Sequence, residues 1–249
     1  MARVLMLTPQ VPFPPRQGTA LRNWGLLRGL AEDHAVSLLS FAAPDQPQTP
    51  PAEITQRVER VAILPQPQRP AGERLRQLAT SPRPDLTLRL RDSAFAAQLD
   101  AWLAVHTFDW VLVEGLELTS YLDQVWARPT PPHVAFDDHN CEYLLQKRAC
   151  LADVRRPRRW VGAGYSLVQW RRLQRYEADI CRRADLVIAV SRADAAVLQR
   201  IAPDVEPLVL PNGLHVAEYA DFAGDAHLEQ RRFVFARPLH FRRNVDGVL

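Results

Sequence analysis

Residues 3–7 read RVLML, and the four apolar residues of this stretch follow one another without alternation. A strand with one solvated face alternates apolar and polar residues, so the uninterrupted run predicts a strand that is buried on both faces. After a short loop, residues 19–33 read TALRNWGLLRGLAED. Apolar residues recur every three positions there, at Leu21, Trp24, Leu27 and Leu30. This spacing predicts a helix with one apolar stripe.

The alternation of strand and helix continues along the chain. Further strands are expected at residues 35–41, 58–64, 110–113, 133–136, 186–190 and 207–210. Helices are expected at residues 93–106, 116–126, 140–151, 164–183 and 192–201, and loops at the Pro-rich residues 44–51 and 65–70. Strands that alternate with helices imply βαβ units. The predicted class is therefore α/β, a Rossmann-like parallel sheet with helices on both faces.

The composition favours a cytoplasmic protein. The 249 residues are 47% hydrophobic, which is enough for a sizeable core. No apolar run approaches the ~18 residues of a membrane-spanning helix, and the first residues, MARVLMLTP, are too short for a secretory signal. Cys141, Cys150 and Cys181 lack metal-ligand spacing and are expected to be reduced thiols.

A basic segment stands out although the net charge is only +3. Between Lys147 and Arg183 there are eleven Lys or Arg residues against Asp153, Glu177 and Asp179. Arginines in 148–183 could contact an anionic membrane surface, and the alternative is a solvated helix face. Nucleic-acid binding is not expected, because neither a helix-turn-helix nor an aromatic-interleaved basic pattern is present.

Polar residues follow the predicted strands at the edge where ligands of parallel sheets bind. The most concentrated group is FDDHNCEYL, residues 136–144, which places Asp137, Asp138, His139 and Asn140 after one strand and Glu142 shortly beyond. The residues expected at the same edge after other strands are Arg16, Gly18, Thr19, Glu114, Ser191, Asn212 and Gly213. The sequence therefore predicts a ligand site made of these loops.

Two of these loops suggest particular roles. In PFPPRQGT, Thr19 is a plausible N-cap that leaves helix N–H groups facing the crevice, and Gly18 permits close approach of a ligand. The loop lacks the three glycines of a dinucleotide fingerprint and the G-K-[ST] of a P-loop. His139 could be a general base, an electrophile or a donor to a sugar hydroxyl, with the neighbouring aspartates orienting its ring. No second histidine lies at helical metal spacing, so no metal site is predicted.

Taken in order, four stretches resemble the N-terminal half of family-4 retaining glycosyltransferases, which have the GT-B fold. They are residues 3–41, FDDHNCEY, WRRLQRYEADICRRADLVIAVSRADAAVL and VLPNGL. The resemblance is strongest to transferases of exopolysaccharide and PEP-CTERM-associated gene clusters. It implies a hexosyltransferase of polysaccharide biosynthesis that uses a nucleotide-diphosphate sugar as donor substrate, needs no cofactor and binds a saccharide or lipid-linked acceptor. His139 would be the catalytic residue that reaches toward the transferred sugar.

The resemblance also implies a domain division. Residues 1–225 would form the acceptor-binding domain, and residues 226–249 would be a stub of the donor-binding domain, whose Glu-x7-Glu motif is absent. His215 stands where the family often has Asp, and Arg237 where it usually has glycine. The truncated chain alone would then be inactive, cytoplasmic, and in peripheral contact with the inner face of the membrane.

Two other functions stay open at this point. The chain could be a non-catalytic acceptor-binding subunit of a split glycosyltransferase. It could also be a sugar-nucleotide epimerase-like protein of related two-domain fold, although residues 171–191 fit that less well.

Overall fold

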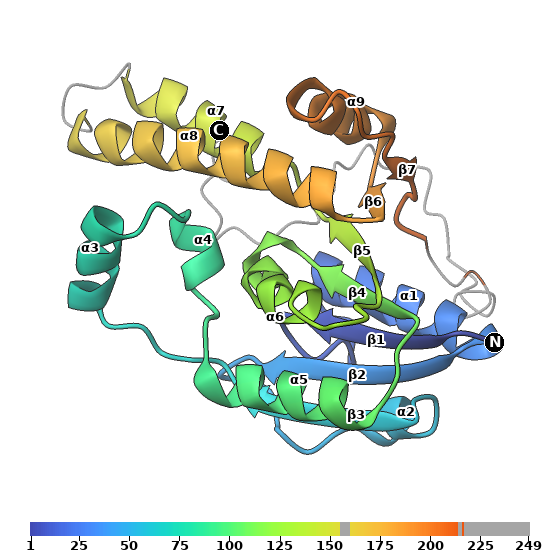
Figure 1. Ribbon diagram of the computed structural model, residues 1–249. Helices are drawn as coiled ribbons and strands as arrows, with labels where there is room; N and C mark the ends of the chain where they lie inside the picture. Colours follow the sequence, from blue (N-terminus) through green and yellow to red (C-terminus); the bar gives the residue numbers. More distant parts are fainter. Residues whose placement is uncertain (155–159, 214–215, 217–249) are drawn as a thin grey trace, which may run out of the picture. The chain divides into compact units, whose positions relative to one another are not determined.

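A computed structural model describes residues 1–154, 160–213 and 216 of the chain (Figure 1). Its seven strands form one sheet in the order β3-β2-β1-β4-β5-β6-β7, and every neighbouring pair is parallel. The strands are β1 (Arg3–Thr8), β2 (Ala35–Ala42), β3 (Arg60–Pro65), β4 (Trp110–Glu114), β5 (His133–Asp138), β6 (Leu186–Ala189) and β7 (Leu208–Val209). The predicted α/β class with a Rossmann-like parallel sheet is confirmed.

Helices connect the strands, as expected for βαβ units. The helices are α1 (Gly18–Asp33), α2 (Ala52–Thr55), α3 (Ala71–Thr80), α4 (Asp85–Leu88), α5 (Ser93–Val105), α6 (Leu122–Trp126), α7 (Glu142–Val154), α8 (Trp160–Arg183) and α9 (Arg192–Ile201), together with the 3-10 helix η1 (Leu116–Tyr121). Sequence patterning did not predict α2, α3 and α4, and the helix expected at 116–126 is split between η1 and α6. The antiparallel helices α7 and α8 pack side by side (Figure 1).

The core lies on both faces of the sheet, because successive side chains of each strand point to opposite faces. In β1, Val4 and Met6 belong to one buried cluster with Trp24 and Leu27 of α1. Leu5 and Leu7 belong to the other cluster, which includes Phe95 of α5 and Leu173 of α8. The uninterrupted apolar run of β1 thus contributes side chains to the hydrophobic clusters on both faces of the sheet.

The order of the strands places a switch point between β1 and β4, because the chain builds the sheet outward from β1 in both directions. The strand β5 is two residues longer than predicted, so Asp137 and Asp138 are its last residues rather than part of the following loop. Both aspartates are fully buried, which the prediction of a polar loop did not anticipate.

The chain divides into two compact units, Met1–Leu214 and His215–Leu249. The predicted boundary between residues 225 and 226, and the predicted stub at 226–249, lie outside the described residues. No helix in the described part of the chain is long and apolar enough to span a membrane.

Candidate functional site

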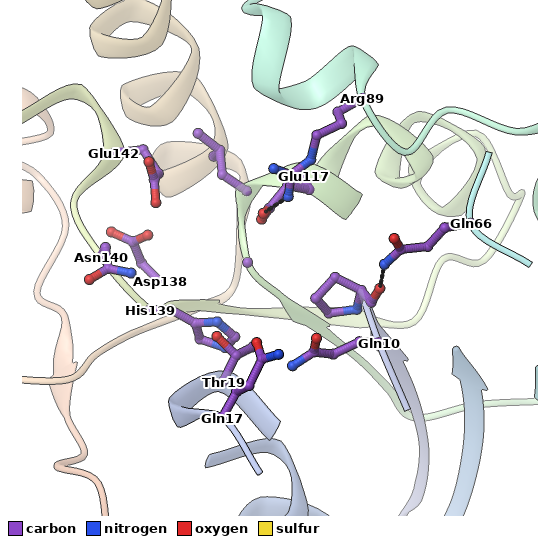
Figure 2. A pocket seen from close by; sticks show the side chains of 13 residues that line it. Gln10, Gln17, Thr19, Gln66, Arg89, Glu117, Asp138, His139, Asn140 and Glu142 are labelled. Atoms are coloured by element: carbon purple, nitrogen blue, oxygen red, sulfur yellow. Dashed lines mark hydrogen bonds and ion pairs between the residues drawn. The ribbon is translucent and has the colours of Figure 1, made fainter. Parts of the chain in front are cut away.

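A polar cavity of about 210 Å³ opens at the carboxyl ends of the central strands (Figure 2). Its wall combines amide side chains, carboxylates, one histidine and one arginine. The polar side chains that line it are those of Gln10, Gln17, Thr19, Gln66, Arg89, Glu117, Asp138, His139, Asn140 and Glu142. Arg89 is paired with Glu117 at 2.7 Å. The wall therefore offers many hydrogen-bond donors and acceptors and little free positive charge.

His139 is the first residue after β5, and its ring is hydrogen-bonded to Glu114. The Nε2 atom of His139 lies 2.7 Å from Oε2 of Glu114, the last residue of β4, which is fully buried. The two residues meet because Glu114 and Asp137 are paired in the parallel register of β4 and β5. Burial opposes a charge on the ring, but the hydrogen bond to Glu114 and the negative charges of Glu114, Asp137 and Glu117 outweigh it and raise the pKa of His139.

Gly115 follows Glu114 at the end of β4 and lines the cavity. Its φ of 82° lies in a region that only glycine adopts readily. A Cβ on Gly115 would lie 2.7 Å from Oε2 of Glu117 and 3.8 Å from Nδ1 of His139. The Nδ1 atom of His139 therefore lies on the side of Gly115, which also lines the cavity.

The buried carboxylates beside His139 are balanced by one arginine. Arg22 of α1 donates from Nε and Nη2 to the two carboxylate oxygens of Asp137, at 2.6 and 2.7 Å. Burial and the negative charge of Asp137 raise the pKa of Glu114 to about 7. Since Arg22 neutralises Asp137, the proton that one of these carboxyl groups takes up near neutral pH resides on Glu114.

A second buried acidic group lies behind the cavity. Glu177 of α8 accepts hydrogen bonds from the backbone N–H groups of Glu142 and Tyr143, at 2.9 and 3.1 Å, and thereby caps the first turn of α7. Burial raises the pKa of Glu177 to about 8. Burial and the charge of Glu177 raise the pKa of Asp138 well above its usual range. Asp138 and Glu177 together therefore hold a proton at neutral pH.

Neither acidic group is built as a metal site. Ligand atoms of Glu114, Asp137 and His139 lie within 4.8 Å of one another, but Asp137 is bound bidentately by Arg22. In the other group, formed by Asp138, Cys141 and Glu177, both oxygens of Glu177 accept backbone N–H groups. Burial also raises the pKa of the Cys141 thiol, which keeps it protonated and a poor ligand. The sequence-based expectation of no metal site stays a prediction.

The structure brings together five of the residues that the sequence singled out at one cavity. These are Thr19, Asp138, His139, Asn140 and Glu142, and Glu114 contacts the ring of His139. Thr19 is not an N-cap, however. The helix α1 already begins at Gly18, and Gln17 occupies the capping position without a side-chain hydrogen bond.

The remaining predicted binding residues are not among those that line the cavity. Gly18 is exposed, and Arg16 lines a neighbouring hollow with Gln17. Ser191 caps α9 by accepting from the backbone N–H of Asp194 at 3.1 Å. Asn212 and Gly213 are exposed, and Oδ1 of Asn212 accepts from Nη1 of Arg22 at 3.0 Å.

Sequence reasoning missed Arg22 and Asn23, although a signal was present. Buried positions Ala20, Asn23, Trp24 and Leu27 follow the three- and four-residue spacing of a helix face. A polar residue on such a face needs a buried polar partner, and the acidic strand ends Glu114 and Asp137 are those partners. The amides of Gln10, Gln17 and Gln66 carried no pattern that distinguishes them from ordinary loop residues.

Comparison with curated protein sequences found no match. Among solved structures, the chain is similar to UGT2 of Phytolacca americana, solved with UDP-2fluoro-glucose and pterostilbene, at 15% identity and a TM-score of 0.47 over 86% of this chain and 54% of that one. It is also similar to UGT71G1 of Medicago truncatula, solved with UDP-glucose, at 13% identity and a TM-score of 0.44 over 85% and 51%. The chain thus spans about half the length of these structures.

The sequence model described as Glycosyltransferase Family 4 matches residues 17–218. The match includes α1 with its buried Arg22, the polar ends of β4 and β5, the α7–α8 pair and β7. It covers most of the chain and every described strand of the sheet except β1. The chain therefore belongs to glycosyltransferase family 4.

Proposed function

We propose that Met1–Leu214 is the acceptor-binding domain of a retaining hexosyltransferase, which transfers a sugar from a nucleotide-diphosphate sugar to a saccharide or lipid-linked acceptor. The observation that carries this proposal is the cavity at the strand ends, where Glu114 holds His139 at 2.7 Å within a wall of amides and carboxylates. Neutral hydroxyl groups both donate and accept hydrogen bonds, and this wall offers partners for both. Family membership supports the reaction class.

The charge of the cavity favours an acceptor sugar over a donor diphosphate as its ligand. Asp138, Glu117 and Glu142 line it, and the one arginine among its described lining residues, Arg89, is already paired with Glu117. A diphosphate would meet these carboxylates without a free guanidinium to receive it. This supports a division of labour in which the donor's nucleotide is held elsewhere, so that this chain alone neither binds donors tightly nor turns them over.

The exopolysaccharide type suggested by the sequence motifs is part of this proposal, and it would explain a lipid-linked acceptor. The proposal extends to peripheral membrane contact through the arginines of α8, at the cytoplasmic face. On α8, Arg171 and Arg175 line two adjacent hollows, and Leu167 and Val168 are exposed on the same helix. Residues 155–159 of the basic segment lie outside the described residues.

A transfer assay with a matched control tests the role of His139. In an enzyme that contains this domain, His139→Ala is expected to lower kcat about 10²–10⁴-fold, the usual effect of removing a positioned acid–base group. Hexose transfer from uridine- and guanosine-diphosphate donors to saccharide acceptors measures it. The control is His106→Ala, because His106 follows α5 and lines a separate hollow with Arg3. Equal activity of the two variants would refute the proposed site.

A further inference from the structure

Arg22 is buried, yet it does not line the described cavity. Its guanidinium makes four hydrogen bonds in three directions. Nε and Nη2 bind the carboxylate of Asp137, and Nη1 donates to the carbonyl oxygen of Leu210 at 2.8 Å and to Oδ1 of Asn212 at 3.0 Å. A buried arginine that binds a carboxylate through two nitrogens offsets the negative charge of that carboxylate.

The neighbouring Asn23 identifies which oxygen of Glu114 accepts hydrogen bonds. With its amide oriented to satisfy its neighbours, Asn23 donates to Oε2 of Glu114 at 2.8 Å and to the carbonyl oxygen of Thr19 at 3.1 Å. The same Oε2 lies 2.7 Å from Nε2 of His139. The other oxygen, Oε1, is buried and has no hydrogen-bond partner among the described residues.

These contacts place the protons of the cluster. Oε2 already accepts a hydrogen from Asn23, so it is best satisfied by accepting a second one from Nε2–H of His139. A proton taken up by Glu114 then resides on Oε1, which has no other hydrogen-bond partner among the described residues. Consequently Nδ1 of neutral His139 carries a lone pair and lies on the side of Gly115 and the cavity.

We propose that Arg22 is a positioning residue that, through Asp137 and Glu114, fixes His139 in the Nε2–H tautomer, so that Nδ1 accepts a hydrogen bond from a hydroxyl group in the cavity. This inference rests on the proposed function for the identity of that hydroxyl group, a sugar hydroxyl. It identifies Nδ1 as the nitrogen of His139 that contacts the ligand, and it gives a role to Arg22, which does not line the cavity. It also connects the site to Leu210 and Asn212, which follow β7.

The charges around His139 determine what the loss of Arg22 does. Glu114 of β4, Asp137 of β5 and Glu117 of η1 contribute negative charge, and Arg22 of α1 opposes them. Removing the positive charge leaves the carboxylates less compensated, which favours the imidazolium form of His139. Simple loosening of the site would instead expose the ring and return its titration to that of a free histidine.

Nitrogen-15 NMR of the full chain labelled at histidine tests the proposal without donor, acceptor or turnover, and therefore separately from the proposed function. The sequence has seven histidines, and the signal lost in His139→Gln identifies the one required. The expected wild-type spectrum at high pH shows a protonated Nε2 and an unprotonated Nδ1. In Arg22→Met the pKa of His139 should rise further, whereas Arg22→Lys, which keeps the charge, should leave it close to the wild-type value.

Two further variants keep the test decisive if Arg22→Met does not fold. Glu114→Gln removes a negative charge at nearly constant shape and should lower the pKa of His139. Asn212→Ala removes one contact of Arg22 but leaves both bonds to Asp137, and should preserve the tautomer. A wild-type signal with a protonated Nδ1, or a His139 titration that Glu114→Gln leaves unchanged, would overturn the proposal.

Discussion

Gly115 lines the cavity and has a positive φ that favours glycine. A side chain there is disfavoured by the φ of 82°, and Oε2 of Glu117, 2.7 Å from an added Cβ, would have to shift. Gly115→Ala is therefore expected to lower the free energy of unfolding by about 1–3 kcal/mol, the usual cost of forcing a residue with a Cβ into such a conformation. Urea unfolding followed by circular dichroism measures the change.

The matched control for this substitution is Gly18→Ala. An added Cβ at Gly18 meets no atom within 4 Å, and the residue opens α1, where alanine is a good helix former. Its free energy of unfolding should stay within about 0.5 kcal/mol of the wild type. Equal destabilisation by the two substitutions would show that Gly115 is not held in the conformation described.

Residue by residue, the sequence indicated which side chains gather at the strand ends but not how they are paired. His139, Asp138 and Asn140 were predictable because a polar run interrupts a buried strand. The bidentate contact between Arg22 and Asp137 joins residues 115 positions apart, and no local pattern specifies such a contact. The sheet register of β4 and β5, which sets Glu114 beside Asp137, was likewise beyond local inference.

At the scale of elements, α7 is anchored by an acidic residue of a different helix. Glu177 of α8 caps α7 while lying close to Asp138, so two buried carboxyl groups hold a proton. Glu142 of α7, Asp137 of β5 and Asp194 of α9 add negative charge around Asp138. Glu177 thus joins α8 to the first turn of α7 next to a second buried carboxyl group.

This arrangement predicts a pH dependence of stability with a defined sign. The folded-state pKa of Glu177 is about 8, above the usual value of 4.5, so the folded chain binds more protons than the unfolded chain between those values. Stability is then expected to fall as pH rises from about 5 to about 8, by at most ~1.4 kcal/mol per pH unit for one proton. Denaturant titrations across this range measure the slope.

Asp138→Asn supplies the comparison for this slope. The asparagine side chain keeps the shape and can donate a hydrogen bond to Glu177, but it removes the second buried negative charge. In this variant the free energy of unfolding should fall much less between pH 5 and 8 than in the wild type. An unchanged slope would mean that the pair does not share a proton.

The exposed surface of α8 gives the second prediction at this scale. If its arginines contact an anionic membrane, each contributes about 1 kcal/mol near the surface. Arg171→Gln with Arg175→Gln should then weaken binding to vesicles containing anionic lipid about 30-fold, as the loss of about 2 kcal/mol implies. Sedimentation with anionic and with neutral vesicles measures the effect.

The control for the vesicle experiment removes the same charge elsewhere. Arg3→Gln with Arg60→Gln changes two arginines that line a hollow at the opposite ends of the strands, and it should leave vesicle binding unchanged. Equal binding of the wild type to anionic and neutral vesicles, or an equal loss of vesicle binding in both double variants, would contradict the membrane contact. The arginines of α8 would then be ordinary solvent-exposed residues.

Helices and strands were predictable from the sequence where burial leaves a long apolar pattern, and not where the element is short or ends in buried charges. Continuous apolar runs such as RVLML identified the strands of the central sheet, because burial on both faces leaves a strong signal. The short helices α2 and α4 have four residues each and carry too little periodicity to be recognised. The end of β5 was misplaced because Asp137 and Asp138 are buried acidic residues, which a polarity pattern assigns to a loop.

For the molecule as a whole, family membership supports the proposed class of reaction, and the lining of the cavity supports the kind of ligand proposed for it. Parallel strands bring the loops after β1, β4 and β5 to one edge, and the residues there supply acceptors, donors and one histidine with a free nitrogen. These features together favour a saccharide at this edge, with the donor's diphosphate bound by other residues.

The most direct measurement of this central claim is an NMR titration of His139 in the isolated chain. The histidine-labelled chain would be titrated with a panel of hexose-containing saccharides, and donor binding would be measured in parallel by calorimetry with uridine- and guanosine-diphosphate hexoses. The account predicts that at least one saccharide shifts the His139 signal without donor, and that no donor binds with micromolar affinity. Micromolar binding of a donor that shifts the His139 signal, with no response to any saccharide, would contradict it.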